Sequence, residues 1–587
     1  MSRIKILKRV VFVIFAIITI RLFFIQIIEH DSWVAKANEA HTMLETIVAR
    51  RGEIYMMDAD TPVAVAMNQT TYAIIIDPAV ADKDKIKSAL EENAGDYITA
   101  NLDEVYSTEG LRYYIVARNV PYSVATKIAD KDINGVWFQK NTSRVYPEGE
   151  MASGLLGFVN ADGIGQYGVE GSFNDLLKGK DGLLKSVSDV NNIALSIGND
   201  NIKIPAKDGE NLVLTVDKGL ERGIEEIAAS ALENSDATNA AVLVMDADTG
   251  EVLTMASLPN YDPKNYGYVK DASAYINQVT EVPYEPASVC KSFAFSAAIN
   301  DGKMTADTEY YNEGYDVIDG WKIENAEKRA SVYGTIDMRT ALYWSLNTGS
   351  IKALKLLGDN PDEITKEGRE RLYTYYHDKF RLGTPTGIEL AETPGTIQDP
   401  NEGYGRDSTY AIMTFGQGLT TTMLQTAVAF NAVVNGGIWR TPTIVKGVLR
   451  DGEIVSMSSI GGAAGEAAAT RYVEDKILSD ETSATMRDLL INNRDYKVRN
   501  GIDREGYAVG GKTGTAQVVV DGAYDNSMST TIGSYVGFVA TAGEMPKYII
   551  MTKMWGEGQA LSGAEAGYLF DDVSNFVINY LKIKPKT

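Results

Sequence analysis

The hydrophobic pattern of the sequence is strongest near its N-terminus, where residues 10–28 read VVFVIFAIITIRLFFIQII, with Arg21 as the one charged residue. As a helix, this stretch would be about 28 Å long, which matches the hydrocarbon core of a membrane. Basic side chains precede it and place the N-terminus in the cytoplasm: Arg3, Lys5, Lys8 and Arg9. The pattern therefore predicts a single membrane anchor at residues 10–28, with the rest of the chain outside the cytoplasm.

A cleaved signal peptide is the alternative interpretation of this N-terminus. The unbroken apolar run Val10–Ile20 suits the core of a signal peptide, and the A-x-A at residues 35–37 resembles a cleavage site. The anchor is favoured because apolar residues continue past Arg21 to Ile28, and the A-x-A lies well beyond them. Arg21 is expected to reach the outer membrane interface or to pair with another membrane helix.

Residues after the anchor mix short strand-like and helical patterns. The stretch 72–77 (YAIIID) is typical of a strand, and 84–95 (DKIKSALEENAG) is typical of a helix. The polar stretch 201–211, which contains Pro205 and Gly209, is interpreted as a crossing between domains. We therefore expect three parts: a cytoplasmic tip and anchor at 1–30, a membrane-proximal α+β domain at 31–207, and a larger domain at 208–587.

The larger domain begins and ends with strand patterns. Residues 240–257 read as two apolar strands around an Asp-Thr-Gly turn, which predicts a hairpin. Helical patterns dominate from 288 to 440, and residues 565–583 have helical apolar spacing. Strand patterns return late in the chain, at 512–520, 534–540 and 547–555. This order predicts an α/β domain whose sheet joins its two ends.

Composition excludes several classes of function. A chain of 587 residues is long enough for two or more domains, and its net charge of −23 argues against binding to a nucleic-acid backbone. A single cysteine, Cys290, excludes an internal disulfide. The three histidines, His30, His41 and His377, have no zinc-ligand spacing. We expect neither a metal nor a cofactor.

The stretch YEPASVCKSF (284–293) raises the first chemical candidate, because Ser288 and Lys291 would share one face of a helix that begins near Ser288. A serine hydroxyl needs a base to become a good nucleophile, and lysine is a base only when it is neutral. Neutralising a free lysine at pH 7 costs about 4 to 5 kcal/mol, which desolvation and a second cation can supply. One S-x-x-K match is weak, since roughly two arise by chance in such a chain. The hypothesis therefore requires another lysine.

Two later stretches strengthen this hypothesis. Ser345-Leu346-Asn347 forms an S-x-N motif, and Lys512-Thr513-Gly514-Thr515 forms a K-T-G motif. The order S-x-x-K, S-x-N, K-T-G is the motif set of penicillin-binding proteins and serine β-lactamases. A chance triple with this order and spacing is far rarer than any single member.

The catalytic roles of these residues fit together. Ser288 is the candidate nucleophile and Lys291 its base, while Lys512 is the second cation that favours a neutral Lys291. Ser345 can relay a proton between Lys291 and the leaving amine. Cys290 lies about 200° around the helix from Ser288 and is expected to face the core.

The remaining motif residues suit substrate binding. Asn347 can hydrogen-bond an amide of the substrate, and Thr513 and Thr515 can donate to a carboxylate. Gly514 allows a bound peptide to approach the strand closely. The backbone N–H groups of Ser288 and Thr515 are predicted to form an oxyanion hole.

Two other catalytic patterns are disfavoured. Residues 506–513 (GYAVGGKT) satisfy the P-loop pattern of nucleotide-binding enzymes, but a P-loop opens a helix, whereas Val518–Val520 continue as a strand. No G-x-S-x-G motif is present, and His377 is the only histidine beyond the juxtamembrane part, which argues against a Ser-His-Asp hydrolase. His377 is interpreted as structural.

With these motifs in hand, the chain resembles a class B penicillin-binding protein, a monofunctional peptidoglycan D,D-transpeptidase, over nearly its whole length. Further stretches carry the resemblance: RLFFIQIIEHD (21–31), RRGEIY (50–55), RVYPEGEMASGLLGFV (144–159), GVEGSFNDLLKGKDG (168–182), LTVD (214–217), FGQGLTTTMLQTA (415–427) and SYVGFVA (534–540). The resemblance implies a non-catalytic pedestal domain beside the membrane, and a transpeptidase domain with an antiparallel sheet flanked by helices.

The resemblance also implies the reaction and the partners. A stem pentapeptide would acylate the serine through its penultimate D-Ala, release its terminal D-Ala, and be transferred to an amine on a neighbouring stem. β-Lactams would acylate the same serine. A membrane-embedded glycan polymerase and other division proteins are the implied partners. SYVGFVA resembles division-type members more than elongation-type ones, which favours a role at the division septum.

Some residues depart from the family pattern, and alternatives remain open. Ala287, Val289 and Cys290 stand where glycine, threonine and phenylalanine are usual, which leaves the affinity for β-lactams open. An elongation-specific transpeptidase, a D,D-carboxypeptidase and a β-lactamase are alternative enzymes, although the E-x-x-L-N loop of class A β-lactamases is not found. A non-enzymatic scaffold is disfavoured, because every chemical group is present.

Overall fold

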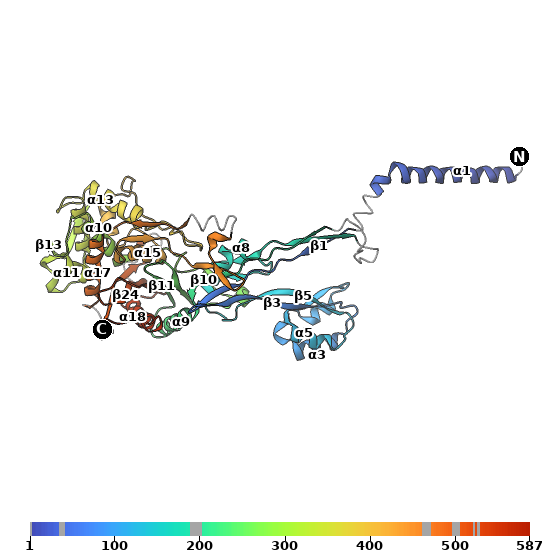
Figure 1. The fold of residues 1–587 in the computed structure, drawn as a ribbon, viewed down its shortest axis with the longest axis horizontal. Helices are drawn as coiled ribbons and strands as arrows, with labels where there is room; N and C mark the ends of the chain where they lie inside the picture. Colours follow the sequence, from blue (N-terminus) through green and yellow to red (C-terminus); the bar gives the residue numbers. More distant parts are fainter. Residues whose placement is uncertain are drawn as a thin grey trace. The chain divides into compact units, whose positions relative to one another are not determined.

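The structure is a computed structural model that describes residues 3–33, 42–187, 202–460, 471–495, 505–520, 523–524 and 529–586 (Figure 1). The chain forms two compact units, one comprising Met1–Gly52 and Lys178–Glu210, the other Glu53–Leu177 and Asn211–Thr587. The A-x-A at 35–37 and His41 lie outside the described residues.

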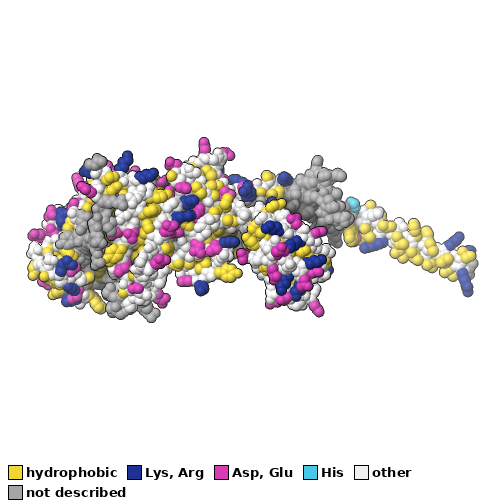
Figure 2. All heavy atoms as spheres, turned by 90° about the horizontal axis from the view of Figure 1, so that it is seen from below, with side chains coloured by type: hydrophobic (Ala, Val, Ile, Leu, Met, Phe, Trp, Pro, Cys, Tyr) yellow, Lys and Arg dark blue, Asp and Glu magenta, His cyan; other side chains and the backbone are white. Residues whose placement is uncertain are grey.

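The first unit contains the predicted apolar helix. Helix α1 (Arg3–Phe23) continues as a π-helical turn (Phe24–Ile28), and no residue of either segment is buried. The helix is long and apolar enough to cross a membrane. Figure 2 shows hydrophobic side chains along it and basic ones at its free end. The helix starts seven residues before the predicted apolar stretch, because basic residues also favour helix.

The first unit also contains a small antiparallel sheet in the order β1 (Thr42–Ile47), β8 (Gly182–Val187) and β9 (Ile202–Ile204). Strand β9 lies inside the stretch 201–211, which the sequence presented as a polar crossing. The sequence did not indicate that these three residues form a strand. Their backbone pairs with Leu183–Lys185 of β8, a contact between distant segments that local composition cannot reveal.

The N-terminal part of the second unit confirms the strand and the helix predicted there. Strand β3 (Thr61–Ile76) pairs with β5 (Val136–Val145) along its C-terminal half. Helix α3 (Lys83–Asn93) starts where the side chain of Asp82 accepts hydrogen bonds from two backbone N–H groups. Other elements of this part are β2 (Ile54–Asp58), β4 (Tyr114–Pro121), α4 (Leu102–Ser107) and α5 (Tyr122–Ala129).

The main sheet of the second unit is antiparallel and has the order β12-β11-β25-β24-β21 (Figure 1). The strands are β11 (Asn239–Asp246), β12 (Val252–Leu258), β21 (Tyr507–Gln517), β24 (Thr531–Thr541) and β25 (Tyr548–Trp555). The predicted hairpin is β11–β12, and the sheet does join the two ends of the domain. Strand β21, which carries the K-T-G motif, lies at the edge of this sheet.

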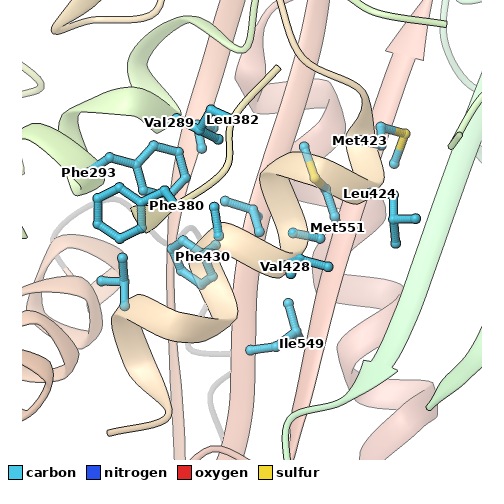
Figure 3. Close-up of a cluster of buried hydrophobic side chains, with 14 of the residues drawn as sticks. Val289, Phe293, Phe380, Leu382, Met423, Leu424, Val428, Phe430, Ile549 and Met551 are labelled. Carbon is cyan, nitrogen blue, oxygen red and sulfur yellow. The ribbon is translucent and has the colours of Figure 1, made fainter. Parts of the chain in front are cut away.

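Successive side chains of each strand point to opposite faces of the sheet, and this divides the core into two clusters. Val242 and Val244 pack with helices α9 (Lys218–Glu233) and α18 (Gly563–Tyr580), whereas Leu243 belongs to the larger cluster on the other face. At the centre of that larger cluster lies α15 (Met423–Val434), all twelve residues of which are buried. In Figure 3, side chains of α15 meet strand β25 on one side and Phe293 on the other.

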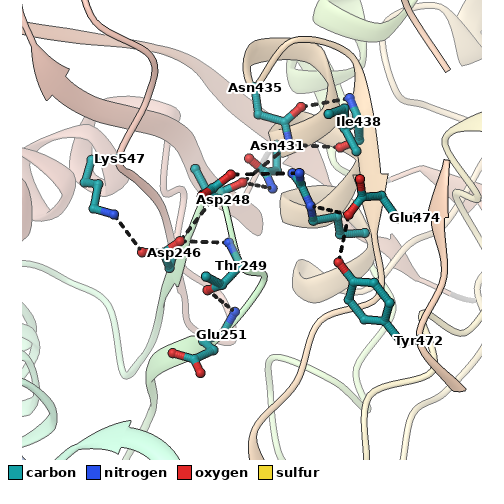
Figure 4. Close-up of polar contacts among 12 residues, drawn as sticks. Asp246, Asp248, Thr249, Glu251, Asn431, Asn435, Ile438, Tyr472, Glu474 and Lys547 are labelled. Carbon is teal, nitrogen blue, oxygen red and sulfur yellow. Dashed lines mark hydrogen bonds and ion pairs between the residues drawn. The ribbon is translucent and has the colours of Figure 1, made fainter. Parts of the chain in front are cut away.

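The Asp-Thr-Gly turn between β11 and β12 is held by polar contacts (Figure 4). A carboxylate oxygen of Asp246 accepts hydrogen bonds from the backbone N–H groups of Asp248 and Thr249, both at 2.9 Å. Asn431 of α15 donates to the carbonyl oxygen of Ala247 at 3.1 Å. The turn is thereby fixed to the central helix.

The region 288–440 is less uniformly helical than the sequence indicated. It contains α10 (Cys290–Asn300), α11 (Met338–Tyr343), α12 (Asn347–Leu357), α13 (Lys366–Tyr373) and α14 (Asp407–Met413). It also contains two short strand pairs, β13 (Glu309–Asn312) with β16 (Gly334–Asp337) and β14 (Tyr315–Ile318) with β15 (Trp321–Glu324). Strands of four residues are too short for a clear alternating pattern in the sequence.

Candidate active site

The nucleophile candidate lies on a tight helical turn, as predicted. Residues Ala287–Val289 form a 3₁₀ turn that leads directly into α10. Ser288 is half-buried, and Lys291 follows on the same face one turn later. The backbone N–H of Ala287 donates to the carbonyl oxygen of Gly416 at 3.1 Å, which fixes the start of this turn.

The three motifs meet at one hydroxyl group. The Nζ atom of Lys291 lies 3.0 Å from Ser288 Oγ, 3.2 Å from Ser345 Oγ and 2.5 Å from the carbonyl oxygen of Ser345. The Nζ atom of Lys512 lies 2.9 Å from the same Ser345 Oγ. Segments more than 160 residues apart in the sequence are thus joined by one continuous path of hydrogen bonds.

Both lysines of this path are buried, with 1% of Lys291 and none of Lys512 exposed. Burial disfavours the charged form of an amine, and two amines around one hydroxyl disfavour double protonation. The Phe415 ring lies beside Lys291, with Nζ 5.9 Å from the ring centroid. The arrangement can therefore hold one amine neutral beside a serine hydroxyl.

Strand β21 places alternate side chains of the K-T-G motif on its two faces. Lys512 and Gly514 face the nucleophile: a Cβ atom on Gly514 would lie 2.6 Å from the carbonyl oxygen of Pro286. Thr515 is exposed, and its Oγ1 accepts a hydrogen bond from the N–H of Gly563 at 2.8 Å, which leaves its own O–H able to donate. As an edge strand, β21 offers backbone groups to an extended peptide.

Asn347 borders a hollow of about 500 Å³. Its Nδ2 donates to the carbonyl oxygen of Glu324 in strand β15 at 2.9 Å, so the S-x-N motif is attached to the β14–β15 pair. The hollow is also lined by apolar residues (Trp321, Ile323, Ile412 and Phe415), by polar ones (Ser408, Thr409 and Gln417) and by the charged residues Lys322 and Glu324. It therefore combines apolar walls with polar and charged groups that a bound molecule could contact.

Residues 415–421 hold the nucleophile turn in place, a role that sequence reasoning missed. The N–H of Gly418 donates to Glu285 Oε1 at 2.8 Å, and Gln417 Nε2 donates to Gln517 Oε1 of β21 at 3.1 Å. Gly416 has φ +77°, and a Cβ atom there would lie 2.1 Å from the carbonyl oxygen of Ala287. The F-G-Q-G sequence was the available signal, since close backbone approach requires glycine.

The structure also places the residues of the disfavoured patterns. Cys290 is fully buried, and burial raises the pKa of its thiol, as expected for a core cysteine. Lys512 lies within a strand and opens no helix, which excludes the P-loop interpretation. His377 stacks on Tyr373 with ring centroids 4.9 Å apart. Over the described ranges, no three His, Cys, Asp or Glu side chains gather as metal ligands would.

Comparison with known proteins assigns the family. Residues 240–575 match the family described as penicillin binding protein transpeptidase domain, and residues 46–214 match the penicillin-binding protein dimerisation domain. The chain therefore belongs to the penicillin-binding protein transpeptidase family. Because it joins this domain to a dimerisation domain, it is a class B penicillin-binding protein, as the motifs indicated.

Curated relatives match along nearly the whole chain. The stage V sporulation protein D of Bacillus subtilis is 28% identical over 100% of this chain and 88% of its own length. The peptidoglycan D,D-transpeptidase FtsI of Buchnera aphidicola is 27% identical over 98% of this chain and 94% of its own length.

Solved structures share the fold. Penicillin-binding protein 2X from Streptococcus thermophilus has a TM-score of 0.69 at 24% identity and covers 92% of this chain and 80% of its own. Penicillin-binding protein 3 from Mycobacterium tuberculosis, crystallised with aztreonam, has a TM-score of 0.66 at 22% identity and covers 92% and 98%.

Proposed function

We propose that the protein is a peptidoglycan D,D-transpeptidase that cross-links stem peptides through an acyl-enzyme on Ser288. The observation that carries the proposal is the hydrogen-bonded path from Ser288 through Lys291 and Ser345 to Lys512. It provides a nucleophile, a base and a proton relay within contact distance of one another.

In the acylation step, Ser288 Oγ forms a bond to the carbonyl carbon of the penultimate D-Ala, and its proton passes to neutral Lys291. The peptide C–N bond then breaks, and the nitrogen of the terminal D-Ala receives a proton through Ser345. Deacylation reverses these roles: an amine of a neighbouring stem attacks the ester carbonyl, loses a proton to the same relay, and Ser288 regains its hydrogen. No proton or electron pair is left over.

The substrate is proposed to lie along β21. The backbone N–H groups of Ser288 and Thr515 would stabilise the developing oxyanion, which in other acyl-transfer sites is worth about 3 to 4 kcal/mol per donor. Asn347 would bind an amide of the stem peptide. Lys512, Thr513 and Thr515 would bind the terminal carboxylate, and Gly514 leaves room for the peptide backbone.

Labelling with a fluorescent penicillin tests this proposal. A stable covalent adduct that disappears in Ser288→Ala supports the acyl-enzyme. Rapid hydrolysis of the penicillin would instead favour a β-lactamase, and no labelling would favour a scaffold. With a stem pentapeptide and an acceptor amine, a cross-linked product supports transpeptidation, whereas free tetrapeptide alone would indicate a D,D-carboxypeptidase.

We also propose how the chain is placed in the cell: residues 1–30 as cytoplasmic tip and anchor, 31–207 as pedestal and 208–587 as the extracytoplasmic transpeptidase domain. Residues 10–28 would cross the membrane beside a membrane-embedded glycan polymerase, with other division proteins as further partners. The basic residues in the first part of α1 support this orientation, and the apolar stretch 10–28, in which Arg21 is the one charged residue, supports the crossing.

A role at the division septum is supported by SYVGFVA in β24 and by the name of the Buchnera relative. The name of the Bacillus relative favours a second candidate, wall synthesis during sporulation. A fluorescently tagged copy at midcell in growing cells would support the septal role. Signal along the side wall would indicate elongation, and signal restricted to sporulating cells would indicate the second candidate.

A further inference from the structure

Strand β25 carries a buried lysine that the proposed mechanism does not use. Lys553 is 2% exposed, and burial lowers its pKa to about 7. Its Nζ donates a hydrogen bond to the carbonyl oxygen of Gln278 at 3.2 Å. An apolar residue would fill a core position without the desolvation cost of an amine, so a lysine here calls for an explanation.

Lys553 lies in the same cross-strand row as the K-T-G motif. Gly514 of β21 is opposite Ser534 of β24, and Ser534 is opposite Lys553 of β25. Side chains in such a row share one face of the sheet. For Gly514, that face is the one that meets the carbonyl oxygen of Pro286, directly before the nucleophile turn.

The amine of Lys553 is enclosed by two aromatic rings. Its Nζ lies 4.4 Å from the ring centroid of Trp555 and 5.0 Å from that of Tyr284. Tyr284 is 5% exposed, and its backbone pairs with Thr421 in both directions, at 2.9 and 3.0 Å. Four residues further along the chain is Ser288. Lys553 therefore contacts the segment that leads into the nucleophile turn.

We propose that Lys553 is a positioning residue for acyl transfer: by holding the ring of Tyr284, it fixes the turn that carries Ser288 against strand β21. The ring face of tyrosine attracts a cation, and an uncharged amine still donates N–H to Gln278. The backbone of Gly514 lies so close to Pro286 that a Cβ atom would not fit between them, and Lys553 contacts Tyr284, so the row supports the turn at two points. If the turn shifted, Ser288 would no longer be aligned with the N–H group of Thr515 and with the substrate, and the reaction would be slower.

This inference rests on the proposed function, and its test must separate the two. The measurement is the rate of acylation by a fluorescent penicillin as a function of its concentration, which yields the first-order acylation rate and the dissociation constant of the initial complex. Failure of the unchanged protein to form an adduct would overturn the proposed function. An adduct in the unchanged protein together with an unaffected Lys553 variant would overturn only the present inference.

Lys553→Met keeps the length of the side chain and removes the amine. The expected result is an acylation rate about tenfold lower, with the dissociation constant within twofold and a Tm equal to or above that of the unchanged protein. Lys547→Met is the matched control, since Lys547 is an exposed residue just before β25; its acylation rate should stay within twofold. An acylation rate of Lys553→Met within twofold of the unchanged protein would overturn the proposal.

A second pair of variants tests whether Lys553 acts through Tyr284. Tyr284→Leu removes the ring and is expected to lower the acylation rate, whereas Tyr284→Phe keeps the ring and should leave the rate within twofold. In the double variant of Lys553→Met and Tyr284→Leu, the rate should be no lower than in Tyr284→Leu alone. A positioning role would be contradicted if the losses of acylation rate in the two single variants were fully additive in the double variant. It would also be contradicted if Tyr284→Leu and Tyr284→Phe had equal acylation rates. The comparison of the two Tyr284 variants can be made even if Lys553→Met fails to fold.

Discussion

Ser345 provides a hydroxyl between two buried amines, 3.2 Å from Lys291 and 2.9 Å from Lys512. In this arrangement the charge on one amine raises the free energy of protonating the other. The second lysine therefore has two roles, since it belongs to the proton relay and also favours the neutral base that Ser288 needs.

Removal of the second lysine should therefore change the pH dependence of the reaction. In Lys512→Met, Lys291 binds a proton more readily, so the acylation rate at pH 7 should fall roughly a hundredfold and the pH–rate profile should shift to more alkaline pH. Acylation by a fluorescent penicillin between pH 6 and 10 measures this. Lys446→Met removes a surface lysine that pairs with Glu251 and is the control. A lower rate with an unshifted profile would show that Lys512 has no influence on the base.

Ala287 occupies the position before Ser288 with φ +50°, in the left-handed region that disfavours a Cβ atom. Ala287→Gly is expected to raise the free energy of unfolding by up to about 1 kcal/mol, because the backbone strain is relieved. The comparison variant is Ala229→Gly, in the middle of helix α9, which should lower the free energy of unfolding by about 1 kcal/mol. Thermal unfolding of both variants checks the prediction, and equal losses would show that Ala287 is unstrained.

Catalytic residues could be identified from the sequence alone where their chemistry requires a particular partner residue. Ser288 and Lys291 are one helical turn apart, and the need for a second lysine directed attention to Lys512. The contacts of Gln417 and Lys553 could not be predicted, because their partners Gln517 and Tyr284 are brought near only by the fold. Neither residue belongs to a local pattern that indicates its role.

At the scale of elements, helix α9 holds a buried pair of carboxyl groups. Glu221 accepts a hydrogen bond from the N–H of Met255 in β12 at 2.9 Å, and Glu225 accepts one from the N–H of Ala152 at 2.8 Å. Burial raises the pKa of both, that of Glu225 from its ordinary 4.5 to about 7. The pair therefore connects α9 to two other segments most stably when it is protonated.

The stability of the fold should consequently fall as pH rises. The folded form keeps its protons between pH 4.5 and about 7 while the unfolded chain loses them, so Glu225 should lower the free energy of unfolding by about 3 kcal/mol across this window. Glu225→Gln should match the unchanged protein at pH 4.5 and exceed its Tm at pH 8. Glu226→Gln, the exposed neighbour, is the control. A Tm difference that is the same at both pH values would refute this assignment.

The elements themselves were predictable where a local pattern was strong. The Asp-Thr-Gly turn and the apolar runs beside it indicated the β11–β12 hairpin, and helical spacing indicated α18. The pair β14–β15 was missed because its strands have four residues each. Helix α15 is buried on every side, so its sequence shows no polar face, and only the fold shows that it lies at the centre of the core.

For the whole molecule, the proposed topology can be tested because Cys290 is the only cysteine and is fully buried. Its raised thiol pKa and its burial should prevent reaction with a membrane-impermeant maleimide. Tyr268→Cys introduces a thiol at a position that is 87% exposed and should be labelled in cells whose membrane is intact. Ile4→Cys should be labelled only after the membrane is broken. Labelling of Ile4→Cys but not of Tyr268→Cys in intact cells would show that the topology is the reverse of the one proposed.

The proposed function depends on covalent chemistry at a single serine, Ser288. Intact-mass spectrometry after incubation with benzylpenicillin, followed by peptide mapping, tests this most directly. The prediction is a mass increase equal to one whole penicillin molecule, mapped to the peptide that contains Ser288 and absent in Ser288→Ala. An unmodified protein, or an adduct on another residue, would contradict the proposed site.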